Sequence, residues 1–450
     1  MIDQRDETSV MAAAGSITAT SRSKSLTAGS DRERMRVGVV GLGYVGLPTA
    51  LSFAGSGADV VGFDVDEARL AAIKDARVDL LPRDHARLVE ALDEQLLRLT
   101  TEPSALAATD AVLVCVPTPV DPHLVPDLTA LASACATVVE QARAGQTIVL
   151  TSTTYPGCTA DLLVRPLEAK GLRVGRDIFV AFSPERIDPG VVDHAPEGTP
   201  RVLGGVTEAC ASMAAGFLSH TAASLHVVSS PEAAEMTKLV ENTFRAVNIA
   251  LANEFADAAR ELKVDVMEII SAAATKPYGF MPFYPGPGVG GHCIPCDPHY
   301  LLWQLRSRRA ASPVMEAAMT AIAARPREVV TMARRALGDR GRPLTGARIL
   351  VTGVTYKPAV ADVRESPALA IIEMLADQGA DVHYEDPLVD TLWTAPTGQL
   401  SAVERPGDTQ WDLVVVHTVH PGHDYEWLSL QPALLDTTYR MADSAGRVTL

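Results

Sequence analysis

The 450-residue chain has little of several features that define whole classes of protein. It has no apolar run of about 18 residues or more, so we expect no transmembrane helix and no membrane partner. Lysine and arginine number 39 against 55 aspartates and glutamates, which gives a formal net charge of −16. Because nucleic-acid binding needs clustered positive charge, we expect no nucleic acid as a partner. Aromatic residues make up only 5%, so leucine, valine and alanine must form most of the cores.

Cysteine is also scarce. Six cysteines are too few for a disulfide scaffold in a chain of this length. The N-terminus shows no apolar segment behind a basic start, so we predict no signal peptide. We therefore expect a cytoplasmic protein with reduced thiols.

What the chain does have is an alternation of short β-rich runs with stretches rich in alanine and leucine. Residues 1–35 lack any periodicity and are predicted to form a disordered tail. The predicted strands lie at 37–40, 59–63, 111–116, 147–151 and 178–182. Strands that alternate with helices form parallel sheets, so residues 36–228 are predicted to be a Rossmann-like domain.

The pattern changes after Ser229. Residues 231–274 contain no glycine, and no proline after Pro231, which predicts one long helix with Ser230 as its N-cap. Further helix is expected to about residue 338. Alternation then returns, with a strand at 347–354, a helix at 367–377 and a strand at 381–384. The predicted fold class is α/β: two Rossmann-like doubly wound domains, 36–228 and 339–450, joined by the long central helix of a helical region at 229–338.

A G-x-G-x-x-G motif, formed by Gly41, Gly43 and Gly46, stands directly behind the first strand and opens a helix. The first glycine allows a tight turn, the second lets the backbone approach a pyrophosphate, and the third allows close packing of helix on strand. The second strand ends in Asp64, where an acid accepts hydrogen bonds from a ribose 2′-hydroxyl and repels a 2′-phosphate. The motif and the acid together predict that the protein binds NAD rather than NADP. The alternative is that the three glycines only shape a turn and bind no cofactor.

A second glycine-rich segment, 286–298, holds Cys293 beside His292, with Asp297 four residues further on. A thiol near an imidazole and an acid is suited to covalent catalysis. Three other interpretations stay open: a structural zinc site on Cys293 and Cys296, a thioredoxin-like redox pair, and a purely structural loop. The chain has no second C-x-x-C pair, so we predict no metal site.

Two polar clusters have both a functional and an ordinary interpretation. Lys238 and Asn242 lie one turn apart on the predicted long helix and share one face, as a catalytic pair or a solvated charged stripe would. Glu185 follows a predicted strand, where it points into a ligand crevice or forms an ordinary salt bridge in a loop.

Together these motifs resemble those of the nucleotide-sugar 6-dehydrogenases, the family of the UDP-glucose, UDP-N-acetylglucosamine and UDP-N-acetylmannosamine dehydrogenases. The resemblance covers nearly all of residues 36–440. The segments that carry it are GLGYVGLP at 41–48, VPTP at 116–119, STTYPG at 152–157, SPER at 183–186, KLVENT at 238–243, GGHC at 290–293, YK at 356–357 and RESP at 364–367.

The sequence around the cysteine resembles the N-acetylhexosamine branch of that family. Residues 272–288 and 187–190 are similar to that branch, and the glucose enzymes carry Phe-Gly-Gly-Ser-Cys where this chain has Val-Gly-Gly-His-Cys at 289–293. The resemblance therefore favours UDP-N-acetylglucosamine as the substrate, with UDP-glucose and UDP-N-acetylmannosamine as alternatives.

The resemblance implies an NAD-dependent four-electron oxidation at carbon 6 of the sugar, with a thiohemiacetal and then a thioester on Cys293. Lys238 and Asn242 would hold the developing oxyanion, and Glu185 would act as acid or base through water. The remaining catalytic residues implied are Asp297 and Thr153, which would orient water or their partners.

The resemblance also implies ligand contacts and an assembly. The implied cofactor-binding residues are Gly41, Gly43, Tyr44, Val45, Gly46, Asp64, Arg69, Pro117, Thr118, Thr153 and Arg364. The implied substrate-binding residues are Glu185, Arg186, Lys238, Asn242, Lys276, Tyr284, Gly290 and Lys357. The C-terminal domain would bind UDP. The long helix would form the interface of a homodimer or higher homo-oligomer and bring Lys276 towards the neighbouring site.

Three positions depart from the family pattern. Cys296 stands where an aliphatic residue is usual, so a disulfide with Cys293 could inactivate the protein on oxidation. Val191 replaces a common asparagine or aspartate. Two residues after Asp436, the family usually has an arginine that contacts the substrate, whereas this chain has Thr438. This departure bears on one substrate contact and on the identity of the sugar.

Two other functions compete with this one. A two-electron dehydrogenase of the hydroxyacid or 6-phosphogluconate type would share the N-terminal fold but need no thiol, and Cys293→Ala would then turn over fully. A non-catalytic protein would bind NAD and oxidise no UDP-sugar.

Overall fold

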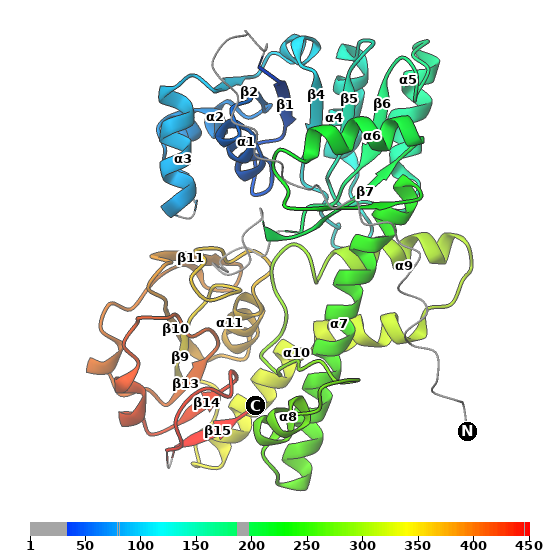
Figure 1. The fold of residues 1–450 in the computed structure, drawn as a ribbon. Helices are drawn as coiled ribbons and strands as arrows, with labels where there is room; N and C mark the ends of the chain where they lie inside the picture. Colours follow the sequence, from blue (N-terminus) through cyan, green and yellow to red (C-terminus); the bar gives the residue numbers. More distant parts are fainter. Residues whose placement is uncertain (1–33, 79, 81, 187–197, 445) are drawn as a thin grey trace, which may run out of the picture. The chain divides into compact units, whose positions relative to one another are not determined.

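The computed structural model describes residues 34–78, 80, 82–186, 198–444 and 446–450. The tail predicted for 1–35, except its last two residues, lies outside the described residues, as do segment 187–190 and Val191. The described residues form two compact units (Figure 1): those up to 119 together with those in 126–238, and 120–125 together with those in 239–450. The predicted three-domain division stays a prediction.

The first unit is built on an eight-stranded sheet with the order β3-β2-β1-β4-β5-β6-β7-β8. All neighbouring strands are parallel except β6 and β7. The order of the first six is that of a dinucleotide-binding fold. The strands are β1 Arg36–Val40, β2 Asp59–Phe63, β3 Leu97–Thr100, β4 Ala111–Val114, β5 Thr147–Leu150, β6 Phe179–Phe182, β7 Arg201–Gly205 and β8 Leu225–Val228.

Helices cover both faces of this sheet. Side chains alternate along each strand, so Val39 packs into one core while Val40 packs into the other. The helices are α1 Gly46–Gly55, α2 Glu67–Lys74, α3 Pro82–Asp93, α4 Thr129–Gln141, α5 Arg165–Ala169 and α6 Glu208–Leu218, with short turns η2 Pro103–Ala108 and η3 Ala160–Val164.

The boundary between the units falls within the long helix α7, Pro231–Leu262. Ser230 caps it as predicted, because its hydroxyl oxygen accepts a hydrogen bond from the Ala233 N–H at 3.3 Å. The prediction of one helix over 231–274 is wrong. Lys263 adopts a φ of +57°, and the Asp265 carboxylate then caps a new helix, α8 Val266–Ala274.

The further helix predicted to about residue 338 is present and is divided into two helices, α9 Asp297–Ser307 and α10 Pro313–Gly338. Arg309 has a φ of +57°, which ends α9, and Pro313 opens α10 at the first helical position, where its missing N–H costs nothing.

The second unit ends in a five-stranded parallel sheet with the order β10-β9-β13-β14-β15. Ile349 and Val351 face one core and Leu350 the other, so this sheet is doubly wound as well. Its elements are β9 Arg348–Thr352, α11 Pro367–Asp377, β10 Asp381–Glu385, β13 Leu413–Val416, β14 Leu434–Asp436 and β15 Arg447–Thr449, with the hairpin β11 Thr391–Thr394 and β12 Gly398–Ser401 and the turns η5 Pro406–Asp408 and η6 Glu426–Leu430. The predicted fold class is confirmed. Among the described residues, no helix is both long and apolar enough to cross a bilayer.

Candidate active site

The glycine motif forms a tight turn between β1 and α1. Gly41 has a φ of +85°, and its N–H donates to the Phe63 carbonyl at 2.9 Å. A Cβ on Gly46 would lie 1.8 Å from the Gly41 carbonyl oxygen, so only glycine lets the helix start this close to the strand. A Cβ on Gly43 would meet no atom within 4 Å, so the backbone there faces open space that a ligand can enter.

Asp64, at the end of β2, holds this turn. Its carboxylate accepts hydrogen bonds from the Leu42 N–H at 2.7 Å and the Asp66 N–H at 3.0 Å. Arg69 donates from Nε to the Leu42 carbonyl at 3.0 Å. Tyr44 and Val45 follow in the turn, just before α1 begins at Gly46. The acid predicted for the ribose therefore lies beside the loop predicted for the pyrophosphate.

Two further loops leave the same edge of the sheet. Pro117 and Thr118 follow β4 and Thr153 follows β5, and β4 lies between β1 and β5. The Ser152 hydroxyl donates to the Val116 carbonyl at 2.8 Å and ties the two loops together. Carboxyl ends of neighbouring parallel strands form the ligand crevice of such sheets.

Glu185 follows β6 and lies in a compact polar cluster. Its carboxylate forms an ion pair with Arg201 of β7 at 2.5 Å and accepts from the Arg186 N–H at 2.8 Å. Its carbonyl oxygen accepts from Lys238 Nζ at 2.8 Å. Arg186 itself donates to the Pro200 carbonyl at 2.7 Å. Arg201 was not among the predicted site residues, because only the antiparallel pairing of β6 with β7 places it beside Glu185.

The cysteine segment lies in the second unit. Cys293 is exposed, and its carbonyl oxygen accepts from the Asp297 N–H at 2.8 Å and the Cys296 N–H at 3.2 Å, so the thiol stands on the turn that starts α9. The amide of Asn242 donates to the Asp297 carboxylate, and both side chains are buried. The structure thus brings together two predicted site residues from α7 and α9.

All six cysteines are thiols, including Cys293 and Cys296. Burial raises the pKa of Cys296 to about 12, which keeps this thiol protonated and a poor redox partner. Among the described residues, no group of three or more His, Cys, Asp or Glu side chains is arranged to hold a metal ion.

A charged cluster lies beside the cysteine. Arg364 pairs with Asp362 through two hydrogen bonds of 2.9 and 2.7 Å, and His292 Nε2 lies 4.0 Å from Asp362. Burial alone would raise the pKa of Asp362, but the bonds from Arg364 outweigh it and lower this pKa. Burial, with the nearby Arg364 charge, lowers the pKa of His292 and favours the neutral imidazole.

The other predicted substrate residues also lie in the second unit. Lys276 Nζ lies 4.9 Å from the centre of the Tyr278 ring. Tyr284 is exposed and Lys357 is half-buried. Gly290 packs against Tyr356, because an added Cβ would lie 2.7 Å from the Tyr356 Cβ.

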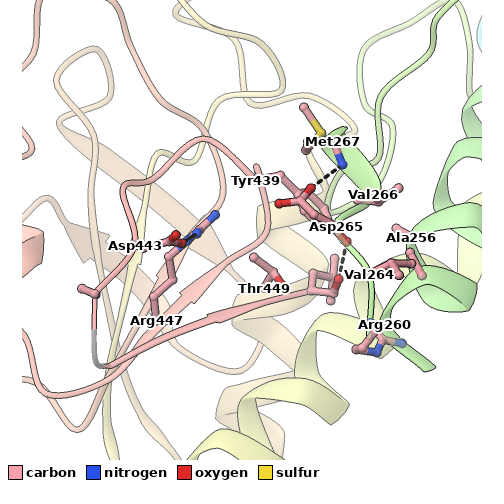
Figure 2. Close-up of a pocket in the computed structure, with 13 residues that line it drawn as sticks. Ala256, Arg260, Val264, Asp265, Val266, Met267, Tyr439, Asp443, Arg447 and Thr449 are labelled. Carbon is pink, nitrogen blue, oxygen red and sulfur yellow. Dashed lines mark hydrogen bonds and ion pairs between the residues drawn. The ribbon is translucent and has the colours of Figure 1, made fainter. Parts of the chain in front are cut away.

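A cavity of about 390 Å³ lies elsewhere in the second unit (Figure 2). It separates the α7–α8 turn from β15, and Arg260, Asp265, Tyr439 and Arg447 are among its lining residues. None of the predicted site residues lines it.

Comparison with known proteins decides the family. Residues 35–222 match the NAD-binding domain of the UDP-glucose/GDP-mannose dehydrogenase family, residues 232–321 its central domain and residues 350–443 its UDP-binding domain. The chain belongs to the UDP-glucose/GDP-mannose dehydrogenase family. It is therefore an NAD-dependent oxidoreductase of nucleotide sugars, as the sequence motifs indicated.

The individual relatives differ in their sugars. The chain is 35% identical to a UDP-N-acetyl-D-glucosamine 6-dehydrogenase from Pseudomonas aeruginosa, over 86% of this chain and 90% of the relative. It is 37% identical to a UDP-N-acetyl-D-mannosamine dehydrogenase from Pyrococcus horikoshii, with the same coverage. The solved structure of a UDP-D-ManNAc dehydrogenase from Pyrococcus horikoshii matches with a TM-score of 0.84 at 32% identity, over 92% of this chain and 98% of that one.

The first unit of this family member fits NAD on its own geometry. The Gly43 backbone faces open space, α1 begins behind it, and the Asp64 carboxylate lies beside the turn. A helix N-terminus with close backbone access suits a pyrophosphate, and the acid suits a ribose without a 2′-phosphate.

The departure at Thr438 has a local explanation. Its hydroxyl and its N–H donate to the buried carboxylate of Asp436 at 2.7 and 2.9 Å. Arg447 donates to the same carboxylate at 3.0 and 3.2 Å. A guanidinium from β15 thus pairs with this acid, while the position of the usual arginine is held by a short hydroxyl.

Proposed function

We propose that the protein oxidises carbon 6 of a UDP-N-acetylhexosamine, with UDP-N-acetylglucosamine as the preferred substrate, from the alcohol to the carboxylate. The observation that carries this proposal is the exposed Cys293 thiol on a glycine-rich turn at the start of α9, in a member of a family of nucleotide-sugar dehydrogenases. A two-electron oxidation to the aldehyde would need no such thiol.

Four electrons leave the sugar in two steps, and bound NAD⁺ is the hydride acceptor for each. Loss of a hydride from carbon 6 and of the hydroxyl proton gives the aldehyde. The Cys293 sulfur then adds to the carbonyl carbon, and the oxygen takes up a proton to give a thiohemiacetal. Loss of a second hydride and the hydroxyl proton gives a thioester, which water cleaves to the carboxylate and the free thiol.

Lys238 and Asn242 are proposed to hold the oxygen on carbon 6 as negative charge develops on it. A positive charge and an amide donor suit this task, and each such donor is worth about 3–4 kcal/mol in comparable sites. Asn242 is supported in this orientation by Asp297, because its amide nitrogen donates to that carboxylate.

Glu185 is proposed as the acid or base that acts through water during thioester hydrolysis, with Thr153 and Asp297 orienting water or partners. The ion pair with Arg201 supports a carboxylate that is held in one rotamer. Bound UDP-sugar would further contact Arg186, Tyr284, Gly290 and Lys357, and NAD would contact the Gly41–Gly46 turn, Asp64, Arg69, Pro117, Thr118 and Arg364.

We further propose a homodimer or higher homo-oligomer through α7. Five apolar side chains recur along this helix at helical spacing and are 41–74% exposed: Val240, Phe244, Leu251, Phe255 and Leu262. An apolar stripe of this length favours burial against a second copy. The Lys276 side chain would then approach the neighbouring site. Sedimentation should show that Phe255→Asp lowers the assembly state, whereas Leu430→Asp, at an exposed leucine on η6, does not.

We also propose that the protein works in a reducing compartment such as the cytoplasm. Its six thiols support this proposal, because chains of oxidising compartments use cysteines mainly as disulfides.

A substrate panel tests the proposed reaction. Purified protein is incubated with UDP-glucose, UDP-N-acetylglucosamine or UDP-N-acetylmannosamine, and NADH is counted against uronate. We expect two NADH per uronate and the highest rate with UDP-N-acetylglucosamine. One NADH with an aldehyde product, or full turnover by Cys293→Ala, would favour a two-electron dehydrogenase. NAD binding without turnover on any of the three would favour a non-catalytic role.

A further inference from the structure

The loop that follows β9 is held by a buried acid. The Asp386 carboxylate, just beyond β10, accepts hydrogen bonds from the Val354 N–H at 2.7 Å, the Thr355 N–H at 3.2 Å and the Leu388 N–H at 2.8 Å. Its side chain has no solvent-exposed surface. Burial alone would raise the pKa of Asp386, but these hydrogen bonds and that of His420 lower it, so the acid is an ionised acceptor.

His420 completes this arrangement from the loop after β13. Its Nδ1 accepts a hydrogen bond from the Ala359 N–H at 3.2 Å. A backbone amide can only donate, so the hydrogen of the neutral ring is assigned to Nε2, which lies 3.2 Å from Asp386 and 3.2 Å from the Thr355 hydroxyl. One buried imidazole thus contacts both ends of segment 355–359. Glu385 lies near enough to His420 to interact with its charge, and Glu385 in turn pairs with His423 at 2.8 Å. The His420 backbone N–H donates to the Tyr425 hydroxyl at 3.0 Å.

The segment is fixed from a second side as well. Thr418 donates from its hydroxyl to the Thr355 carbonyl at 2.7 Å, and Thr355 donates to the Lys357 carbonyl at 3.1 Å. The Tyr356 N–H donates to the Asp362 carbonyl at 3.0 Å. Ala359, which bonds to His420, has a φ of +60°, a conformation that a residue other than glycine keeps only when its surroundings impose it.

Tyr356 connects this segment to the loop of the thiol. A Cβ on Gly291 would lie 2.9 Å from the Tyr356 ring, and one on Gly290 would lie 2.7 Å from the Tyr356 Cβ. Gly291 also has a φ of +81°. The two glycines therefore pack their backbone directly on the tyrosine, two and three residues before Cys293. A shift of Tyr356 must move this backbone or open a gap beneath it.

We propose that His420 and Asp386 are positioning residues, which fix Tyr356 and through it the Gly290–Gly291 backbone that sets the place of the Cys293 thiol. The inference rests on the proposed function, because it concerns the step in which the thiol reacts. It assigns to the C-terminal half a role in the thiol chemistry in addition to UDP binding. The effect is specific: the second oxidation needs the thiol in place, whereas the first does not.

The test separates the two oxidations. Tyr356→Ala and His420→Leu are compared with the conservative variants Tyr356→Phe and His420→Gln. Trp393→Ala, an exposed aromatic residue on β11, is the matched control. The first step is measured with the UDP-sugar while hydroxylamine traps the aldehyde, and the second with the UDP-6-aldehyde sugar. A further readout needs no turnover: the rate at which iodoacetamide alkylates Cys293.

We expect Tyr356→Ala and His420→Leu to slow oxidation of the aldehyde about tenfold or more, while trapped first-step product changes less than about threefold. Alkylation of Cys293 should quicken about threefold or more in both, because a contact beneath the loop is lost. Tyr356→Phe and His420→Gln should recover most of the second step, and Trp393→Ala should match the wild type.

Equal losses in both steps, or unchanged aldehyde oxidation with unchanged alkylation, would overturn the inference. Its failure can be told apart from failure of the proposed function. A wild-type protein that oxidises no UDP-sugar refutes the proposed function, and the alkylation rates still decide whether the segment positions Cys293. A wild type that turns over while the variants behave like it refutes the positioning role alone.

Discussion

Replacing Arg201 by methionine tests the polar cluster around Glu185 most directly. The two side chains are 9% and 14% exposed, and Arg201 Nη2 lies 2.5 Å from the carboxylate. Removing one partner of a buried ion pair leaves the other charge uncompensated, which costs about 3–5 kcal/mol. Glu185 keeps the Arg186 N–H and some exposure to water, so we expect a loss nearer 2–3 kcal/mol in the free energy of unfolding.

The assay exploits an asymmetry of composition. The four tryptophans, at 303, 393, 411 and 427, all lie in the second unit, so their fluorescence follows that unit alone. Unfolding by urea is followed by fluorescence and by far-ultraviolet circular dichroism, because a protein with two cores need not unfold in one step. Arg201→Met should destabilise the transition seen only by dichroism and leave the fluorescence transition in place.

A double-mutant cycle with Glu185→Gln isolates the pair. We expect a coupling energy of about 2 kcal/mol between the two substitutions. Arg173→Met is the matched control, since its ion pair with Asp177 is exposed and such pairs contribute about 1 kcal/mol or less. A coupling energy near zero, or a loss no larger than that of the control, would refute the claim that Arg201 fixes Glu185.

Three further predictions concern single residues. Gly46→Ala should abolish NAD binding in calorimetry, because its Cβ would lie 1.8 Å from the Gly41 carbonyl; an unchanged affinity would contradict this. Burial lowers the pKa of His417 from 6.5 to about 4. Between these pH values the imidazole is protonated in the unfolded chain but stays neutral in the folded protein. Stability should therefore fall as the pH drops from 6.5 towards 4, by on the order of 2 kcal/mol at pH 5 in fluorescence-detected unfolding, and His417→Gln should lose less. Iodoacetamide should modify one thiol per native chain, Cys293, because the other five are buried. Peptide mass spectrometry measures this, and modification of Cys296 would contradict the prediction.

Local signals in the sequence predicted a large part of this fold. The helix expected at 367–377 is α11, and the N-cap expected at Ser230 is present, because both depend on neighbouring residues and on periodicity. The break between α7 and α8 carried a signal that was missed. Asp265 followed by Glu268 is the kind of pair that starts a helix, although no glycine or proline precedes it.

The contacts between distant segments could not be predicted in this way. Strand β7 contains Gly204 and Gly205, which weaken any strand prediction. They are there because the backbone is crowded: a Cβ on Gly204 would lie 2.1 Å from the Ser230 carbonyl, and one on Gly205 would lie 2.3 Å from the Ala211 nitrogen. Only the tertiary structure brings Arg201, on the same strand, to Glu185.

The two sheets open with the same turn. In each, a glycine of positive φ follows the first strand, and the next amide donates at 2.7 Å to the acid beyond the second strand, from Leu42 to Asp64 and from Val354 to Asp386. Sequence motifs do not reveal this likeness, because the second turn lacks the G-x-G-x-x-G pattern and its acid lies further along the chain.

The surroundings of the acid explain why the same turn serves different purposes. Asp64 is half-buried beside Gly43, whose backbone faces open space, so both remain within reach of a dinucleotide. Asp386 is enclosed completely and bonded to His420, and a Cβ on Gly353 would lie 2.0 Å from a carbonyl oxygen. Asp386 is therefore enclosed by its hydrogen bonds to its own loop and to His420, and its carboxylate cannot accept hydrogen bonds from a ribose. The repeated architecture therefore supplies one dinucleotide site, and its second half is shaped to hold a segment that packs on the loop of Cys293.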